Sequence, residues 1–105
     1  YLTEISNVFI SLPKVERDQS HVWHLFVIKT PYREKFQKHL ESEGVMTLVH
    51  YPIPPHKQMA YKSMDMLSLP LTEELHEQVL SLPISPVMTE EEVSAVIKAV
   101  NSFEV

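Results

Sequence analysis

The sequence predicts an α/β sandwich, a small sheet backed by helices, and three observations support this fold class. Residues 21–29 (HVWHLFVIK) place apolar side chains on two alternating faces, as a buried strand does. A proline then opens an amphipathic helical pattern over residues 32–42. Another helical pattern, capped at Thr89, closes the chain. Strand and helix patterns in this order are typical of a sheet layered against helices.

The composition limits the class of protein. With 105 residues, 44% of them hydrophobic, the chain has the size of one domain with a modest core. It contains no cysteine, which excludes disulfides and thiolate chemistry. No apolar run approaches the ~20 residues of a membrane-spanning helix, and there is no signal-peptide pattern. We therefore expect a cytoplasmic protein that has no membrane partner.

The net charge of −5 belongs to the last third of the chain. Residues 71–105 carry seven acidic side chains and one lysine, so no basic face forms and we expect no nucleic-acid partner. The chain starts with Tyr1 instead of methionine and has a single glycine, Gly44. These two features lead us to expect that residues 1–105 are one domain of a longer protein.

The first part of the chain predicts a short approach to the strand. Residues 1–6 have the spacing of a last helical turn, residues 8–12 are extended, and residues 14–20 form a polar connection. The strand at residues 21–29 is apolar on both faces, so we expect another domain or subunit to cover its second face.

The helix expected at residues 32–42 has an inward stripe at i, i+4 and i+8, formed by Tyr32, Phe36 and Leu40. Gly44 follows as its C-terminal cap. A second strand is then expected at residues 45–50.

A loop with three prolines follows this second strand, and one or two helical turns are expected over residues 56–62. Proline fixes its own φ and extends the residue before it, so the loop should be stiff. A rigid polar loop after a buried strand is a usual place for ligand contacts in α/β proteins.

The last third predicts two helices with an extended segment between them. A helix over residues 71–80 has Thr72 as its N-cap, and its inward residues are Leu71, Leu75 and Val79. Residues 81–87 are extended. In the last helix Thr89 and Glu92 form a capping box, and the inward residues are Val93, Val96, Ile97 and Val100.

The candidate binding residues are His50, Tyr51, His56 and Tyr61. Their imidazoles and phenols are suited to donate hydrogen bonds to a phosphate, a sugar hydroxyl or the edge of a cofactor. A purely structural interpretation has equal weight, in which His50 and Tyr51 cap the sheet edge and pack under the loop.

The other reactive side chains fit no catalytic or metal site. His21 and His24 are three residues apart on a strand, so they face opposite sides and cannot share one metal ion. His24 is expected to be a packed histidine that is hydrogen-bonded within the sheet. No lysine lies in the apolar surroundings that would activate it for Schiff-base chemistry.

Several segments together resemble a known family, the DegT/DnrJ/StrS sugar aminotransferases. The segments are residues 21–28 (HVWHLFVI), the run from His50 to His56 (HYPIPPH) with Tyr61, residues 80–86 (LSLPISP) and residues 88–93 (MTEEEV). They follow the order and spacing of the family's C-terminal domain over nearly the whole chain.

The resemblance implies the small C-terminal domain of a fold-type I enzyme that depends on pyridoxal phosphate. Such an enzyme moves an amino group from glutamate or glutamine to a keto-sugar linked to a nucleotide, for polysaccharide, glycan or antibiotic sugar biosynthesis. The cofactor would be bound by a large N-terminal domain outside these residues, and the intact enzyme would be a homodimer. His50, Tyr51, His56 and Tyr61 match the family's substrate-side loop, and this segment alone would be inactive.

A second function remains open from the sequence: a non-catalytic binding or regulatory module with the same fold. Its distinguishing feature would be a polypeptide that carries no cofactor, since fold alone does not decide function.

Overall fold

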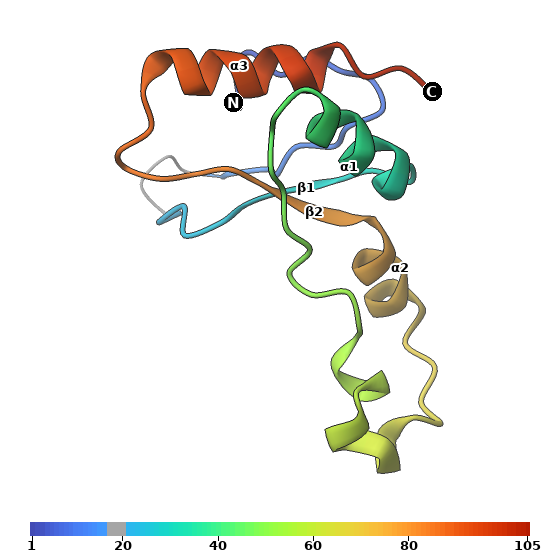
Figure 1. Cartoon of the computed structure of the whole chain (residues 1–105). Coiled ribbons are helices and arrows are strands. Elements are labelled where there is room, and N and C mark those ends of the chain that lie inside the picture. The colour runs from blue at the N-terminus through green and yellow to red at the C-terminus, as the bar shows by residue number, and fades with distance from the viewer. Residues whose placement is uncertain (17–20) are drawn as a thin grey trace.

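The computed structural model describes residues 1–16 and 21–105, and residues 17–20 of the expected polar connection lie outside the described residues. The described strands are β1 (Phe26–Lys29) and β2 (Val79–Leu82), and the α-helices are α1 (Arg33–Ser42), α2 (Pro70–Gln78) and α3 (Glu90–Asn101). Figure 1 shows α1 and α3 on one side of the strands, with the chain between α1 and α2 extending away on the other side. The predicted α/β fold of a small sheet backed by helices is confirmed.

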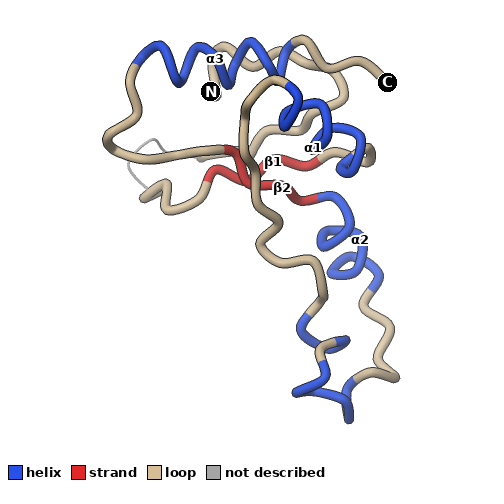
Figure 2. Tube along the Cα trace, in the orientation of Figure 1, coloured by secondary structure: helices blue, strands red, loops and turns tan. Residues whose placement is uncertain are grey.

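The two strands form an antiparallel sheet at the centre of the chain (Figure 2). Phe26 lies opposite Leu82, and Ile28 lies opposite Leu80. All four side chains are buried, and because side chains alternate along a strand they share the face covered by the helices. Ser81 therefore points to the opposite face of the sheet.

Isolated bridges extend the sheet on both sides. Ser11 exchanges backbone hydrogen bonds of 2.8 and 2.9 Å with Lys29, so the expected extended segment at residues 8–12 is present only around Ser11, because residues 8 and 9 form a turn. Leu48 exchanges bonds of 2.8 and 3.3 Å with Ser81 on the outer side of β2. These bridges satisfy strand-edge backbone groups that would otherwise need water.

The core lies between the sheet and the helices. Phe36 and Leu40 of α1 are fully buried, which confirms the inward stripe of this helix, although Tyr32 at its start is 36% exposed. The ring of Phe103 packs edge-to-face on Phe36, with centroids 4.9 Å apart. His39 donates a 2.8 Å hydrogen bond from Nε2 to the carbonyl of Ala99 and so joins α1 to α3.

The predicted ends of two helices are confirmed. Thr89 Oγ1 accepts a hydrogen bond from the Glu92 amide, and Glu92 Oε2 accepts one from the Thr89 amide, so the capping box of α3 is complete. Gly44 follows α1 with a φ of 78°, the left-handed conformation that favours glycine.

The first strand is shorter than predicted. It starts at Phe26 because Trp23 has a φ of 51°, which interrupts the extended backbone, and its ring stacks on Phe26. His24 is exposed, so the expectation of a packed histidine inside the sheet is wrong.

The prediction of a second strand at residues 45–50 is also wrong, since only Leu48 forms a bridge. The second strand is β2, at residues for which the sequence predicted a helix end and an extended segment. Leu80 and Leu82 of β2 lie on the buried face of the sheet, whereas Met46 and Leu48 of the predicted strand are largely exposed.

Helix α2 differs from its prediction at both ends. It begins at Pro70 with Leu69 as the N-cap, so Thr72 lies inside the helix, and it ends at Gln78. Leu71 is 70% exposed and does not point inward.

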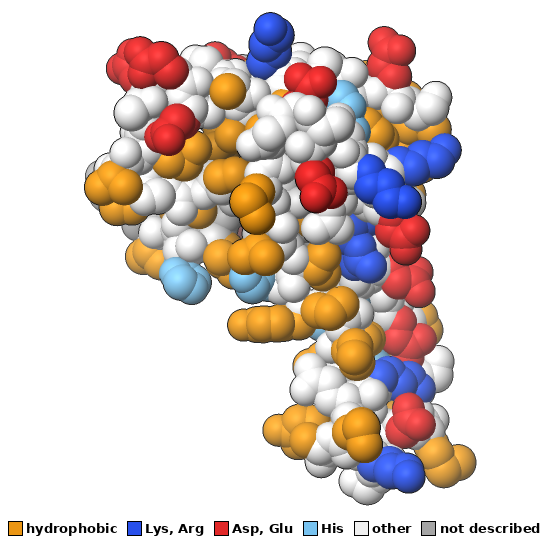
Figure 3. All heavy atoms as spheres, in the orientation of Figure 1, with side chains coloured by type: hydrophobic (Ala, Val, Ile, Leu, Met, Phe, Trp, Pro, Cys, Tyr) orange, Lys and Arg blue, Asp and Glu red, His pale blue; other side chains and the backbone are white. Residues whose placement is uncertain are grey.

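Between the Leu48 bridge and α2 the chain forms a protrusion, residues 51–69, which we call the arm (Figure 1). Two 3₁₀ turns, Pro55–Lys57 and Met59–Met64, lie within it, as the sequence predicted for this part of the chain. The exposed apolar side chains of the arm are Tyr51, Ile53, Met59, Tyr61, Met64, Met66, Leu67 and Leu69. Figure 3 shows orange side chains gathered over this protrusion. None of the described helices is long and apolar enough to cross a membrane.

Candidate functional site

The arm is joined to the sheet at His50. The Nδ1 atom of His50 lies 2.8 Å from Oγ of Ser81, which is a buried residue of β2. The Leu48–Ser81 bridge holds the backbone two residues before His50 against the same strand. The imidazole is therefore fixed by both a backbone and a side-chain contact.

A cavity of about 210 Å³ lies beside this pair, and its lining includes His24, His50 and Ser81. The rest of the lining is mainly apolar: Leu25, Met46, Leu48, Leu82, Pro83 and Ile84. A mostly apolar recess with a few polar groups is the usual composition of a small-molecule site.

The arm is anchored a second time by His56 and Glu73. His56 is 3% exposed, and its Nε2 atom donates a 2.9 Å hydrogen bond to Oε1 of Glu73 in the first turn of α2. The same carboxylate oxygen accepts a 3.0 Å bond from the Leu69 amide. These bonds, first from the Leu69 amide and then from His56, hold the pKa of Glu73 below its usual value.

A third contact joins the last turn of α2 to the start of the arm. His76 Nδ1 donates a 2.5 Å hydrogen bond to the backbone carbonyl of Tyr51. Arg33 in turn donates from its guanidinium to the carbonyl of His76. Because α1, α2 and the arm are linked through these groups, the arm has a defined direction from the domain.

The structure divides the sequence-predicted binding residues into two kinds. Tyr51 is 65% exposed and Tyr61 is 51% exposed, and neither phenol hydroxyl has a hydrogen-bond partner among the described residues. His50 is half-buried at the base of the arm. His56 is buried, and its Nδ1 has no partner within the described part of the chain.

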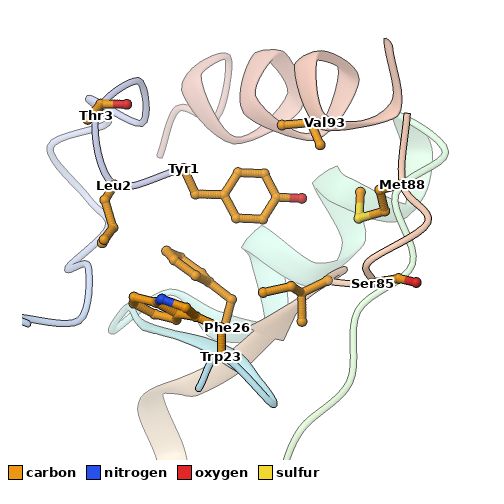
Figure 4. Close-up of a pocket in the computed structure, with 9 residues that line it drawn as sticks. Tyr1, Leu2, Thr3, Trp23, Phe26, Ser85, Met88 and Val93 are labelled. Carbon is orange, nitrogen blue, oxygen red and sulfur yellow. The ribbon is translucent and has the colours of Figure 1, made fainter. Parts of the chain in front are cut away.

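A larger cavity, of about 410 Å³, lies away from the arm next to the first residues of the chain. Figure 4 shows the rings of Tyr1, Trp23 and Phe26 along its wall, with Met88 and Val93 across from them. The Tyr1 hydroxyl donates a 2.8 Å hydrogen bond to the carbonyl of Pro83, and burial raises the pKa of this phenol. The wall is held by ring packing and offers few polar groups to a ligand.

No cluster of three or more metal-ligating side chains occurs among the described residues. His21 stacks on Trp23 with ring centroids 4.1 Å apart, and its Nδ1 accepts a hydrogen bond from the Trp23 amide. This nitrogen is therefore occupied by a local contact.

The comparison with protein families identifies the chain. The model of the DegT/DnrJ/EryC1/StrS aminotransferase family matches residues 1–101. The chain belongs to this family.

Relatives in the DegT/DnrJ/EryC1/StrS family are much longer than this chain. The dTDP-3-amino-3,6-dideoxy-alpha-D-galactopyranose transaminase of Aneurinibacillus thermoaerophilus is 53% identical over 103 residues, which are 98% of this chain and 28% of the relative. The crystal structure of Streptomyces venezuelae DesV in complex with a ketimine intermediate has a TM-score of 0.83 and 39% identity, over 95% of this chain and 27% of that one.

A further solved structure of the same fold contains a cofactor. It is NtdA from Bacillus subtilis with bound PMP, with a TM-score of 0.76 and 38% identity, and it covers 88% of this chain and 22% of that one. This chain thus spans about a quarter of the length of these relatives.

The cavities beside His50 and Trp23 do not fit pyridoxal phosphate, and the recesses that contain Lys35 and Lys38 lie on the exposed side of α1. The cofactor requires a lysine, a carboxylate for its ring nitrogen and donors for its phosphate. Neither the cavity beside His50 nor the one beside Trp23 is lined by a lysine or a carboxylate in the described ranges 1–16 and 21–105. The NtdA chain that contains PMP is about four times as long as this chain.

Sequence reasoning missed Ser81, Glu73 and His76, which hold the arm in place. Ser81 lies in an extended run, and Glu73 resembles an ordinary first-turn acid that complements the helix dipole. Only the fold brings Ser81 next to His50 and Glu73 next to His56, at separations of 31 and 17 residues. The proline loop was the one available signal that this region is structured.

Proposed function

We propose that this chain is the C-terminal small domain of a pyridoxal-phosphate-dependent aminotransferase. The enzyme would transfer an amino group from glutamate or glutamine to a keto-sugar linked to a nucleotide. The observation that carries the proposal is the end-to-end match to a dTDP-sugar transaminase of which this chain covers 28%.

Within this enzyme the cofactor would withdraw electrons from the carbon that exchanges its amino group. The present chain would contribute to binding. Tyr51 and Tyr61 offer exposed phenol hydroxyls on the arm, and His50 offers an imidazole at its base. These are the groups we assign to contact with the sugar or the phosphates of the substrate.

His56 has a different part in this proposal. Its Nε2 is engaged by Glu73 and its ring is buried, so it orients the arm that carries Tyr51 and Tyr61. An arm fixed at its base loses less conformational entropy when substrate binds. The proposed homodimer and the large N-terminal domain are the expected partners of the exposed apolar side chains on the arm.

The first experiment is the absorbance spectrum of the longer polypeptide that carries this segment, before and after borohydride. A visible chromophore that borohydride reduces and fixes to a lysine would support the proposal. Amino transfer from glutamate or glutamine to a dTDP-linked keto-sugar is then measured, and the 105-residue chain alone should show none. A colourless polypeptide that ignores pyridoxal phosphate would favour the non-catalytic module.

The second experiment tests the arm. Tyr51→Phe and Tyr61→Phe remove one hydroxyl each, and the expected loss in kcat/KM is about tenfold for a hydroxyl that bonds to substrate. Tyr32→Phe is the matched control, because Tyr32 is also partly exposed but lies at the start of α1. Equal activity of all three variants would remove the tyrosines from the proposed site.

A further inference from the structure

The pair formed by His50 and Ser81 has two possible proton arrangements. Either the Ser81 hydroxyl donates to Nδ1, so that the ring proton is on Nε2, or Nδ1–H donates to Oγ. The two arrangements present opposite properties to a ligand, since Nε2 is a donor in the first and an acceptor in the second. The 2.8 Å distance allows both.

Burial of Ser81 decides between them. Ser81 is 5% exposed, and within the described residues its Oγ has a hydrogen bond only with His50. If Nδ1–H donated to Oγ, the hydroxyl proton would remain buried without an acceptor. A buried donor without a partner is costly and rare, so the hydroxyl must donate to Nδ1.

The backbone groups of Ser81 are already paired with Leu48. Its own carbonyl accepts from the Leu48 amide, and its amide donates to the Leu48 carbonyl. On the neighbouring strand Val27 lies opposite Ser81 and is apolar. The imidazole of His50 is the one side chain that the described structure places within hydrogen-bond distance of this hydroxyl.

We propose that Ser81 is a positioning residue that fixes His50 as its Nε2–H tautomer and so makes the ring a hydrogen-bond donor to an oxygen acceptor of the ligand. The ring borders the cavity of about 210 Å³, whose polar lining consists of His24, His50 and Ser81. A ligand oxygen here is a sugar hydroxyl or a phosphate oxygen, and this assignment of ligand rests on the proposed function. The assignment of the tautomer does not rest on the proposed function.

The test is the ¹⁵N spectrum of the 105-residue chain labelled at histidine, recorded at about pH 8, where an ordinary histidine is neutral. The chain carries its own reference signals. His39 contacts the Ala99 carbonyl through Nε2, so this nitrogen carries its proton. His76 contacts the Tyr51 carbonyl through Nδ1, so it has the opposite tautomer.

In the native chain His50 should give the pattern of His39, with a protonated Nε2 and an unprotonated Nδ1. In Ser81→Ala the His50 signals should shift to the average of both tautomers, and in Ser81→Thr, which keeps the hydroxyl, the native pattern should return. The signals of His39 and His76 should stay unchanged in both variants. The inference is overturned if native His50 resembles His76, or if Ser81→Ala leaves the pattern of His50 as it was.

The longer enzyme supplies the functional half of the test. Ser81→Ala should lower kcat/KM by roughly three- to tenfold, through KM more than kcat, and should add nothing in a His50→Gln background. An additive effect in the double variant would show that Ser81 acts independently of His50. Failure of all amino transfer would reject the proposed function, while the tautomer result would stand by itself.

Discussion

Glu73 in the first turn of α2 accepts a 2.9 Å hydrogen bond from the buried imidazole of His56, which belongs to the arm. The same oxygen accepts the Leu69 amide at 3.0 Å, so one carboxylate joins the outgoing and the returning chain of the arm. The Glu73 side chain is 35% exposed, whereas that of His56 is 2% exposed. Loss of the carboxylate therefore leaves a buried donor that water reaches poorly.

Glu73→Ala should loosen the arm without unfolding the core. An unsatisfied buried donor costs about 1–3 kcal/mol, which corresponds to roughly a tenfold to hundredfold faster exchange of the Leu69 amide if the arm opens locally. Hydrogen exchange followed by NMR measures this change. Glu74→Ala is the matched control, because Glu74 is exposed and contacts only the Gln78 side chain among the described residues. Equal exchange in the two variants would contradict the anchoring role.

The same anchor should depend on pH. The pKa of Glu73 is lowered in the folded chain, first by the Leu69 amide and then by His56, from an ordinary value of 4.5. A lowered folded pKa means that the stabilisation is present above pH 4.5 and is lost as pH falls through the folded pKa. In the native chain, exchange of the Leu69 amide, corrected for its intrinsic rate, should accelerate as the pH falls through the folded pKa of Glu73. Glu73→Gln should remove this pH step, and a step of equal size in that variant would assign it to another group.

The core should respond to substitution far more strongly than the arm. Phe36 is fully buried and packs on Phe103, so Phe36→Ala should reduce the free energy of unfolding by about 3–5 kcal/mol. Urea unfolding followed by circular dichroism measures the loss. Leu71→Ala is the comparison, because Leu71 is 70% exposed on α2 and should change stability by less than about 0.5 kcal/mol.

The helices were predictable because their signals are local. The capping box at Thr89 and Glu92 and the stripe of Phe36 and Leu40 each lie within a few turns of one helix, and both are present in the structure. The second strand was not predictable from such signals. Leu80 and Leu82 are as apolar as the residues around Leu48, and pairing with β1 across more than fifty residues decides which segment becomes the strand.

The candidate site was predictable in its location but not in its internal contacts. The prolines after His50 indicated a stiff loop, and the structure has two 3₁₀ turns there. The groups that hold it are Ser81, Glu73 and His76, which come from later elements. No pattern in one sequence distinguishes these three side chains from ordinary ones, because their partners are set by tertiary structure.

His76 is the third anchor, and its removal should free the start of the arm. Its Nδ1–H donates to the Tyr51 carbonyl, a bond worth about 0.5–1.5 kcal/mol, so His76→Ala should raise the population of the open arm roughly three- to tenfold. Trypsin cleavage at Lys57 and Lys62, which are exposed on the arm, should accelerate by the same factor when opening is fast.

His39→Ala is the matched control for His76→Ala, since His39 also bonds to a backbone carbonyl but joins α1 to α3. The His39→Ala variant should have a lower unfolding midpoint in urea. His76→Ala should increase the rate of trypsin cleavage with little effect on that midpoint. Equal cleavage rates in native chain and His76→Ala would show that the arm is held by His50 and His56 alone.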